Sequence, residues 1–171
     1  MRHLNKQSGF TIVEILVSTL VFSIIAIVVS GVFVQVLDLE QRSFASQKVQ
    51  ENGLFIMELM SREIRVSQIQ NQNSPDCTAT SLTIIHPVNG TVTYSLNDGV
   101  LQRTADGVTT NLSTPDVAFS RLNFCVMGSG PTDHIQSRVA ILASIQNKNG
   151  KQIISTSFET TVSSRDVQTE F

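Results

Sequence analysis

The stretch "SGFTIVEILVSTLVFSIIAIVVSGVFVQV", residues 8–36, decides the fold of this chain. From Phe10 to Val36 it contains 27 residues, and Glu14 is the only one with an ionisable side chain. A helix of roughly 20 apolar residues is enough to cross the hydrocarbon core of a bilayer, which is about 30 Å thick. The stretch therefore predicts a transmembrane helix close to the N-terminus.

The residues before this stretch predict its orientation. Arg2, His3 and Lys6 lie upstream of Gly9, and basic residues beside a membrane span stay on the cytoplasmic side. We therefore expect a single-pass protein of the cytoplasmic (inner) membrane, with the N-terminus inside and the C-terminus outside. A cleaved secretory signal does not fit, because its apolar region is only about 7–15 residues long.

A plain signal anchor would explain the length and the orientation but not the position of Glu14. An ionised carboxylate near the centre of a membrane costs roughly 2.5–3.5 kcal/mol on insertion scales, and less near an interface. Intramembrane acids therefore usually have a partner. The sequence predicts that Glu14 meets a positively charged group.

The residues Lys6–Glu14, KQSGFTIVE, resemble the processing motif of type IV pilins and type II secretion pseudopilins. The resemblance implies that a prepilin peptidase cleaves after Gly9 and methylates the new N-terminal residue, Phe10. It also implies that the Glu14 carboxylate faces the Phe10 ammonium of a neighbouring subunit and sets the axial register of a filament. Such a pair is physically reasonable, because opposite charges attract strongly where the dielectric constant is low and either charge alone is penalised.

The next segment, Asp38–Gln70, contains no proline and has the spacing of an amphipathic helix. Its apolar stripe consists of Val49, Gly53, Ile56, Met60 and Ile64, flanked by Phe55, Leu59 and Ile69. The opposite face is polar, and Glu58 and Arg62 have the spacing of a helical ion pair. Within the segment, Val49–Arg65 is similar to PilW-like minor pilins and larger minor pseudopilins.

Beyond this helix the pattern changes to that of short strands. A polar linker at residues 71–81, NQNSPDCTATS, ends the helix. The strand-like runs that follow are Ser81–Val88, Gly90–Leu96, Val100–Thr104, Val117–Met127, Ser137–Gln146 and Gln152–Ser163. Asn97–Gly99 predicts a hairpin turn, and Pro87 predicts that the first run is an edge or broken strand. We expect five to seven antiparallel strands.

This order of elements predicts an α+β, pilin-like fold, in which one long N-terminal helix packs on a C-terminal antiparallel β-sheet. The predicted parts are a cleaved cytoplasmic leader at residues 1–9, a transmembrane or filament-core helix at 10–36, an amphipathic helix at 37–70 and a sheet region at 71–171. Residues 37–171 are expected to form the soluble domain.

The two cysteines, Cys77 and Cys125, both lie on the predicted exported side, where disulfides persist. A bond between them would close a loop of 49 residues and contribute on the order of 4 kcal/mol in the chain-entropy model. Two unpaired thiols are the alternative. The spacing of the cysteines is not that of a zinc site, and His86 and His134 do not complete one. We expect no metal and no cofactor.

Composition argues against direct nucleic-acid binding. Removing Arg2 and Lys6 with the leader leaves 10 of the 12 Lys and Arg residues against 14 Asp and Glu residues, and no basic stripe is evident. No local signature of a catalytic nucleophile appears either, because Gly128–Gly130 lacks the spacing of a nucleophile elbow. The sequence does not predict an enzyme.

The function that the sequence predicts is that of a minor pilin or pseudopilin. Such a noncatalytic subunit is processed and assembled into, or at the tip of, a type IV pilus or type II secretion pseudopilus, and it becomes part of an extracytoplasmic filament. The implied partners are prepilin peptidase, other pilin or pseudopilin subunits and the inner-membrane assembly platform. Two alternatives stay open: a permanently signal-anchored extracytoplasmic binding module, and a membrane-anchored enzyme.

Overall fold

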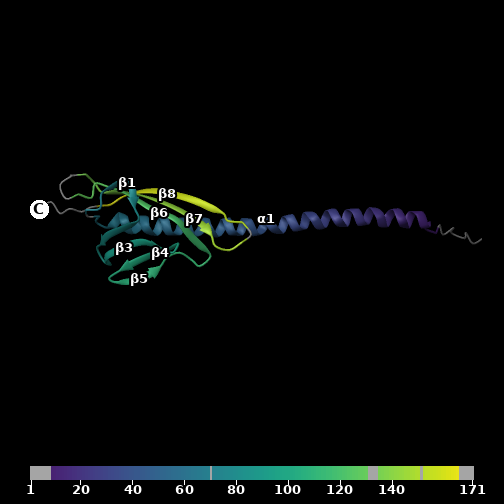
Figure 1. Ribbon diagram of the computed structural model, residues 1–171, viewed down its shortest axis with the longest axis horizontal. Coiled ribbons are helices and arrows are strands. Elements are labelled where there is room, and N and C mark those ends of the chain that lie inside the picture. The colour runs from purple at the N-terminus through teal and green to yellow at the C-terminus, as the bar shows by residue number, and fades with distance from the viewer. Residues whose placement is uncertain (1–8, 70, 131–134, 151, 166–171) are drawn as a thin grey trace, which may run out of the picture. The chain divides into compact units, whose positions relative to one another are not determined.

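The computed structural model describes residues 9–69, 71–130, 135–150 and 152–165. The predicted leader up to residue 8, the predicted helix end at residue 70 and His134 lie outside the described residues. The chain divides into two compact units, Met1–Gln41 and Arg42–Phe171. Figure 1 shows the elements of the two units.

The described part of the first unit consists mainly of the N-terminal part of α1, a helix that runs from Ile12 to Val66. The described residues of this unit are all exposed in the single chain. The apolar stretch of α1 has a mean hydropathy of 2.8, and the helix is long and apolar enough to cross a membrane. The hydroxyl groups of Ser18, Ser23 and Ser30 donate to carbonyl oxygens four residues earlier. These polar groups therefore find partners within the helix, as a hydrocarbon environment requires.

The second unit contains the C-terminal part of α1 with its apolar stripe. All five predicted core positions of this stripe are buried, and Met57 is buried beside them. The prediction for Phe55 was wrong, because its side chain is 62% exposed and points away from the core. The helix ends at Val66 because the next backbone groups pair elsewhere: Gln68 exchanges N–H···O bonds of 3.0 and 2.9 Å with Ile85.

Within the described ranges, eight antiparallel strands follow the helix and form two sheets. The strands are β1 (Ser74–Ala79), β2 (Ser81–His86), β3 (Gly90–Asn97), β4 (Val100–Ala105), β5 (Val108–Asn111), β6 (Val117–Met127), β7 (Arg138–Asn147) and β8 (Ser155–Ser163). One sheet has the order β1-β6-β7-β8 and the other the order β2-β3-β4-β5. The sequence did not predict β1, which lies within the predicted linker, or β5, whose four residues are all exposed.

The hairpin predicted from Asn97–Gly99 is confirmed. It joins β3 to β4, and both Asp98 and Gly99 have positive φ angles, 48° and 75°, as a type I′ turn requires. The expectation for Pro87 is also confirmed. Strand β2 ends at His86, directly before the proline, and it lies at the edge of its sheet.

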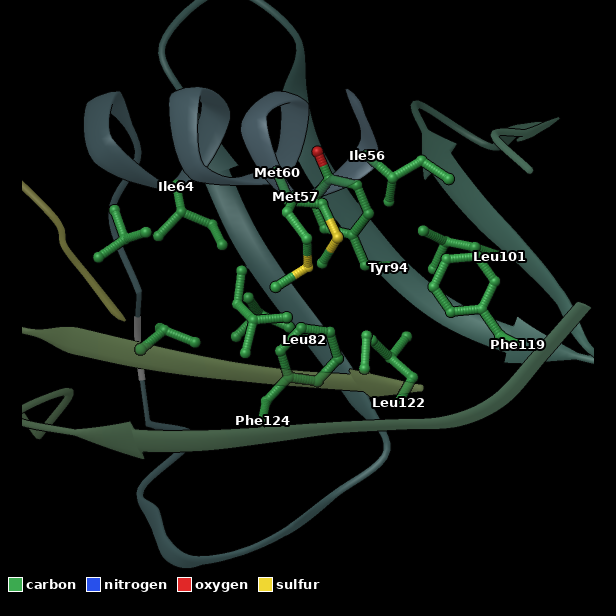
Figure 2. Close-up of a cluster of buried hydrophobic side chains, with 14 of the residues drawn as sticks. Ile56, Met57, Met60, Ile64, Leu82, Tyr94, Leu101, Phe119, Leu122 and Phe124 are labelled. Carbon is green, nitrogen blue, oxygen red and sulfur yellow. The ribbon is translucent and has the colours of Figure 1, made fainter. Parts of the chain in front are cut away.

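The core of the second unit lies where α1 and the two sheets meet (Figure 2). Met60 and Ile64 come from the helix, Tyr94 comes from β3 and Phe124 comes from β6, and none of these four side chains is exposed. The predicted α+β class, one long helix packed against antiparallel β structure, is therefore confirmed. The β structure consists of two four-stranded sheets rather than one.

Candidate processing and assembly site

The predicted cleavage position lies just outside the helix. Gly9, Phe10 and Thr11 have no regular secondary structure, and α1 begins at Ile12. The Phe10 side chain is 80% exposed. The peptide bond between Gly9 and Phe10 is therefore not part of the helical hydrogen-bond ladder, in which each N–H bonds to the carbonyl oxygen four residues earlier. An enzyme that needs an extended substrate can bind it without unwinding α1.

Thr11 fixes the start of the helix. Its Oγ1 accepts a hydrogen bond from the backbone N–H of Glu14 at 3.3 Å, and its carbonyl oxygen accepts one from Ile15. Thr11 is thus the N-cap, and Glu14 occupies the third helical position, as in the capping-box pattern Thr-x-x-Glu. Sequence reasoning missed the role of Thr11, although this four-residue pattern was the signal that could have revealed it.

The carboxylate of Glu14 lies in the first turn of α1. The partial positive charge of a helix N-terminus favours a negative side chain there. No ion pair among the described residues includes Glu14. Gly9, Phe10 and Glu14 thus lie in one short exposed segment at the start of α1.

A second charged cluster, which the sequence did not predict, lies in the second unit. The Glu63 carboxylate accepts hydrogen bonds from Nε and Nη2 of Arg103, at 3.0 and 2.7 Å. The Tyr94 hydroxyl donates to the same carboxylate, and Nδ2 of Asn89 donates to it at 3.4 Å. The cluster therefore joins α1 to β3, to β4 and to the turn between β2 and β3.

The environment of Glu63 shifts the pKa values of three groups. Burial raises the pKa of Glu63, but the hydrogen bonds from Arg103 and Tyr94 and the charge of Arg103 outweigh this effect and hold the pKa below its ordinary value. The hydrogen bond to Glu63 raises the pKa of Arg103. Burial, together with the hydrogen bond to Glu63, raises the pKa of Tyr94. Glu63 and Arg103 are thus both charged at neutral pH, and their ion pair connects α1 to β4.

One signal for this cluster was present in the sequence. Glu63 lies three positions after Met60 and seven after Ile56, and this spacing places it at the margin of the buried stripe. Arg103 occupies an inward-facing position of β4, two residues after the buried Leu101. The sequence could not show that the two side chains meet, because 40 residues separate them.

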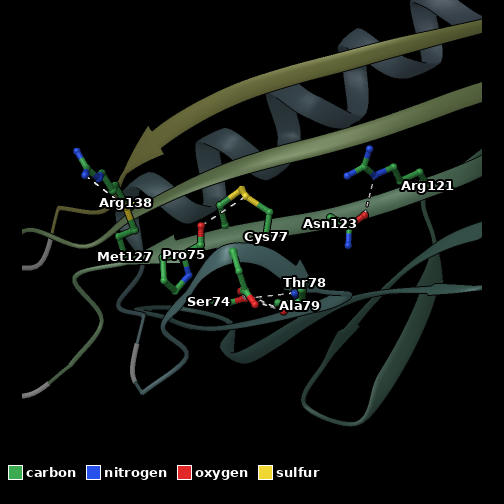
Figure 3. Close-up of a disulfide and its surroundings, with 11 residues drawn as sticks. Ser74, Pro75, Cys77, Thr78, Ala79, Arg121, Asn123, Met127 and Arg138 are labelled. Atoms are coloured by element: carbon green, nitrogen blue, oxygen red, sulfur yellow. Dashed lines mark hydrogen bonds between the residues drawn. A yellow bond between two sulfur atoms is a disulfide. The ribbon is translucent and has the colours of Figure 1, made fainter.

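Cys77 and Cys125 form a disulfide that joins β1 to β6 (Figure 3). The register of this strand pair shifts between Ser74 and Ala79, and Cys77 lies within the irregular stretch. The disulfide therefore joins β1 to β6 where the hydrogen-bond ladder between these two strands is interrupted. Among the described residues, no group of three or more His, Cys, Asp or Glu side chains is arranged to hold a metal ion.

Comparison with known proteins identifies one feature. Residues 4–30 match the family model described as the prokaryotic N-terminal methylation motif. The matched residues include Gly9, Phe10, Thr11 and Glu14, and they extend into the apolar part of α1. No curated protein and no solved structure matches the chain.

Proposed function

We propose that this chain is a minor pilin or pseudopilin. Its methylation motif supports the view that the chain is a type IV pilin-like substrate of prepilin peptidase. The motif match supports the resemblance of Lys6–Glu14 to type IV pilins and pseudopilins. In this proposal the chain is a noncatalytic subunit that is assembled into, or at the tip of, a type IV pilus or type II secretion pseudopilus. The "minor" assignment rests on the similarity of Val49–Arg65 to PilW-like proteins and larger minor pseudopilins.

The proposal includes a membrane arrangement for the two units. The apolar part of α1 and the motif support membrane anchoring. We propose that the leader is cytoplasmic, that residues 10–36 span the membrane before assembly, and that the second unit is exported. The disulfide between Cys77 and Cys125 supports export, because such bonds persist in oxidising compartments and are rare in the cytosol.

In the proposed processing step, prepilin peptidase hydrolyses the peptide bond after Gly9 and methylates the new amino group of Phe10. The accessibility of this bond, outside the helix and beside an 80% exposed Phe10, is the structural observation that carries the proposal. The Phe10 ammonium then becomes a cation close to the helix start. In a filament it pairs with Glu14 of a neighbouring subunit, and each charge offsets the desolvation of the other.

Mass spectrometry tests the processing step. The full-length chain is expressed in membranes with and without a coexpressed prepilin peptidase, and the intact mass and the N-terminal peptide are measured. We expect a chain that begins with N-methylated Phe10 only when the peptidase is present. A Gly9→Val variant should keep its leader. A wild-type chain that keeps its leader despite an active peptidase would overturn the proposal and favour a permanently signal-anchored binding module.

A matched pair of variants tests assembly. Glu14→Gln and Glu40→Gln each remove one exposed negative charge from α1, but only Glu14 lies in the first helical turn. We expect both variants to be cleaved and methylated, and only Glu14→Gln to be lost from sheared filaments. Equal incorporation of both variants would show that the Glu14 charge does not act in assembly.

A further inference from the structure

The described residues contain three Asn-Gly dipeptides: Asn52–Gly53, Asn89–Gly90 and Asn149–Gly150. In such a pair the backbone nitrogen of glycine can attack the side-chain carbonyl carbon of asparagine, because glycine has no Cβ to obstruct the approach. The attack needs a backbone that can bend toward the side chain and a side chain that is free to turn. The local structure therefore decides which of the three pairs can react.

Contacts with neighbouring residues restrict the movement of the first two Asn-Gly pairs. Asn52 and Gly53 lie within α1, where Nδ2 of Asn52 donates to the Lys48 carbonyl oxygen at 2.9 Å and Gly53 lies against the Phe158 ring. The side chain of Asn89 donates to Glu63, and its backbone N–H donates to Nδ1 of His86 at 3.1 Å. Both pairs must break these contacts before the glycine nitrogen can reach the side chain.

The third pair lies in the connection between β7 and β8, and it is exposed. The Asn149 side chain makes no hydrogen bond with the described residues. The Asn149 carbonyl oxygen accepts a hydrogen bond of 2.7 Å from Nδ2 of Asn147, whose side chain is almost completely buried. This bond draws electron density from the Asn149–Gly150 peptide, and the Gly150 N–H becomes a stronger acid. The deprotonated nitrogen is the attacking nucleophile.

We propose that Asn149 is a site of spontaneous deamidation in the folded protein. The Gly150 nitrogen loses its proton to solvent and forms a bond to Cγ of Asn149. The side-chain nitrogen takes up a proton from solvent, its bond to Cγ breaks, and it leaves as ammonia. Water then opens the resulting five-membered imide at either carbonyl group. The products are aspartate and isoaspartate, and no oxidant or reductant takes part.

The modification changes a loop with several specific contacts, none of which, among the described residues, involves the Asn149 side chain or the Gly150 nitrogen. Asn147 donates to the carbonyl oxygens of Asn149 and Gln152, and it accepts from the Ile154 N–H at 2.6 Å. The Lys148 N–H donates to the carbonyl oxygen of Asp116. Deamidation adds a negative charge at this loop, and the isoaspartate form also lengthens its backbone by one methylene group. The loop of an aged chain therefore differs from that of a new one.

Peptide mapping of the full-length chain in detergent micelles tests the inference. The protein is kept folded at 37 °C at neutral and at mildly alkaline pH, and the conversion of each amide to an acid is followed by mass spectrometry. We expect Asn149 to react at least ~10-fold faster than Asn52 and Asn89, because local structure protects the other two. The rate at Asn149 should rise with pH, because the nucleophile is an anion.

The denatured chain supplies the control. In concentrated guanidinium chloride the three identical dipeptides lose their structural differences, and we expect their rates to become similar. An Asn149→Gln variant should abolish the fast reaction in the folded protein and leave the other two sites unchanged. Equal rates at all three sites in the folded chain, or a slower rate at Asn149, would overturn the inference.

Discussion

The Glu63 carboxylate and the Arg103 guanidinium form a two-point contact between α1 and strand β4, with N···O distances of 2.7 and 3.0 Å. Only 17% and 18% of their side chains are exposed, whereas the pair Glu58–Arg62 on the same helix is more than 70% exposed on both sides. Removing one partner of a buried pair leaves an uncompensated charge. The same loss at an exposed pair is compensated by water.

Replacing Glu63 therefore affects stability strongly. We expect Glu63→Gln to lower the free energy of unfolding by about 2 kcal/mol, because the partly buried Arg103 loses its charged hydrogen-bond partner. Glu58→Gln is the matched control and should change the free energy by only about 0.5 kcal/mol. Guanidinium denaturation of both full-length variants in micelles measures the difference. Similar losses in the two variants would show that burial of the Glu63 pair has no energetic importance.

Acid should weaken the protein through the same contact. The pKa of Glu63 in the folded state lies below its ordinary value of 4.5, so the folded state releases this proton more readily than the unfolded chain. The contribution of Glu63 is complete above the unfolded pKa, and it is lost as the pH falls through the folded pKa.

Denaturation measured from pH 6 downward tests this pH dependence. The free energy of unfolding of the wild type should decrease as the pH drops below about 4.5, the pKa of Glu63 in the unfolded chain. The Glu63→Gln variant should show a smaller decrease over the same pH range. The hydroxyl groups of Ser74 and Thr78 lower the pKa of Asp76, so some acid dependence should persist in the variant. Identical slopes in the two proteins would contradict the assignment to Glu63.

The sequence predicted the features that depend on local periodicity. The buried stripe of α1 was correct at Val49, Ile56 and Met60 because helical spacing alone places them on one face. The turn at Asn97–Gly99 was correct because it is set by two residues with positive φ. The motif at Gly9–Glu14 was recognisable because the match lies in a continuous segment.

The features that the sequence did not predict depend on partners that are distant in the chain. Strand β1 contains Pro75 and Asp76, which are poor strand formers, and it forms because β6 and the Cys77 disulfide hold it. The division into two sheets is a property of strand pairing and not of any single strand. Phe55 was misassigned because it lies directly beside the buried Ile56 in the sequence, although neighbouring residues of a helix face different directions.

Gly53 is required by a close approach between helix and sheet. A Cβ atom at this position would lie 2.3 Å from the Phe158 ring, and overpacking of this kind costs about 1–3 kcal/mol. We expect Gly53→Ala to lower the melting temperature despite the higher helix propensity of alanine. Gly31→Ala is the control, because nothing lies within 4 Å of a Cβ there. A double variant with Phe158→Leu should recover most of the loss, and the absence of such coupling would argue against the clash.

Reduction of the disulfide should destabilise the second unit without affecting the first. Cys77 and Cys125 are 48 positions apart, and opening a loop of this size is expected to cost about 4 kcal/mol of unfolding free energy. A Cys77→Ser/Cys125→Ser variant, compared with the oxidised wild type by denaturation, measures this cost. Addition of a reductant should lower wild-type stability and leave the variant unchanged. A double variant as stable as the oxidised protein would exclude this contribution.

The cap at Thr11 predicts local behaviour at the start of the membrane helix. Because the Thr11 hydroxyl accepts from the Glu14 N–H, its removal should free this amide and cost about 1 kcal/mol of local stability. Hydrogen exchange of the full-length chain in micelles should therefore be about fivefold faster at Glu14 in Thr11→Ala. Thr11→Ser keeps the acceptor and should retain the protection. If both variants exchange like the wild type, the start of α1 is set by the membrane-spanning stretch alone and not by the cap.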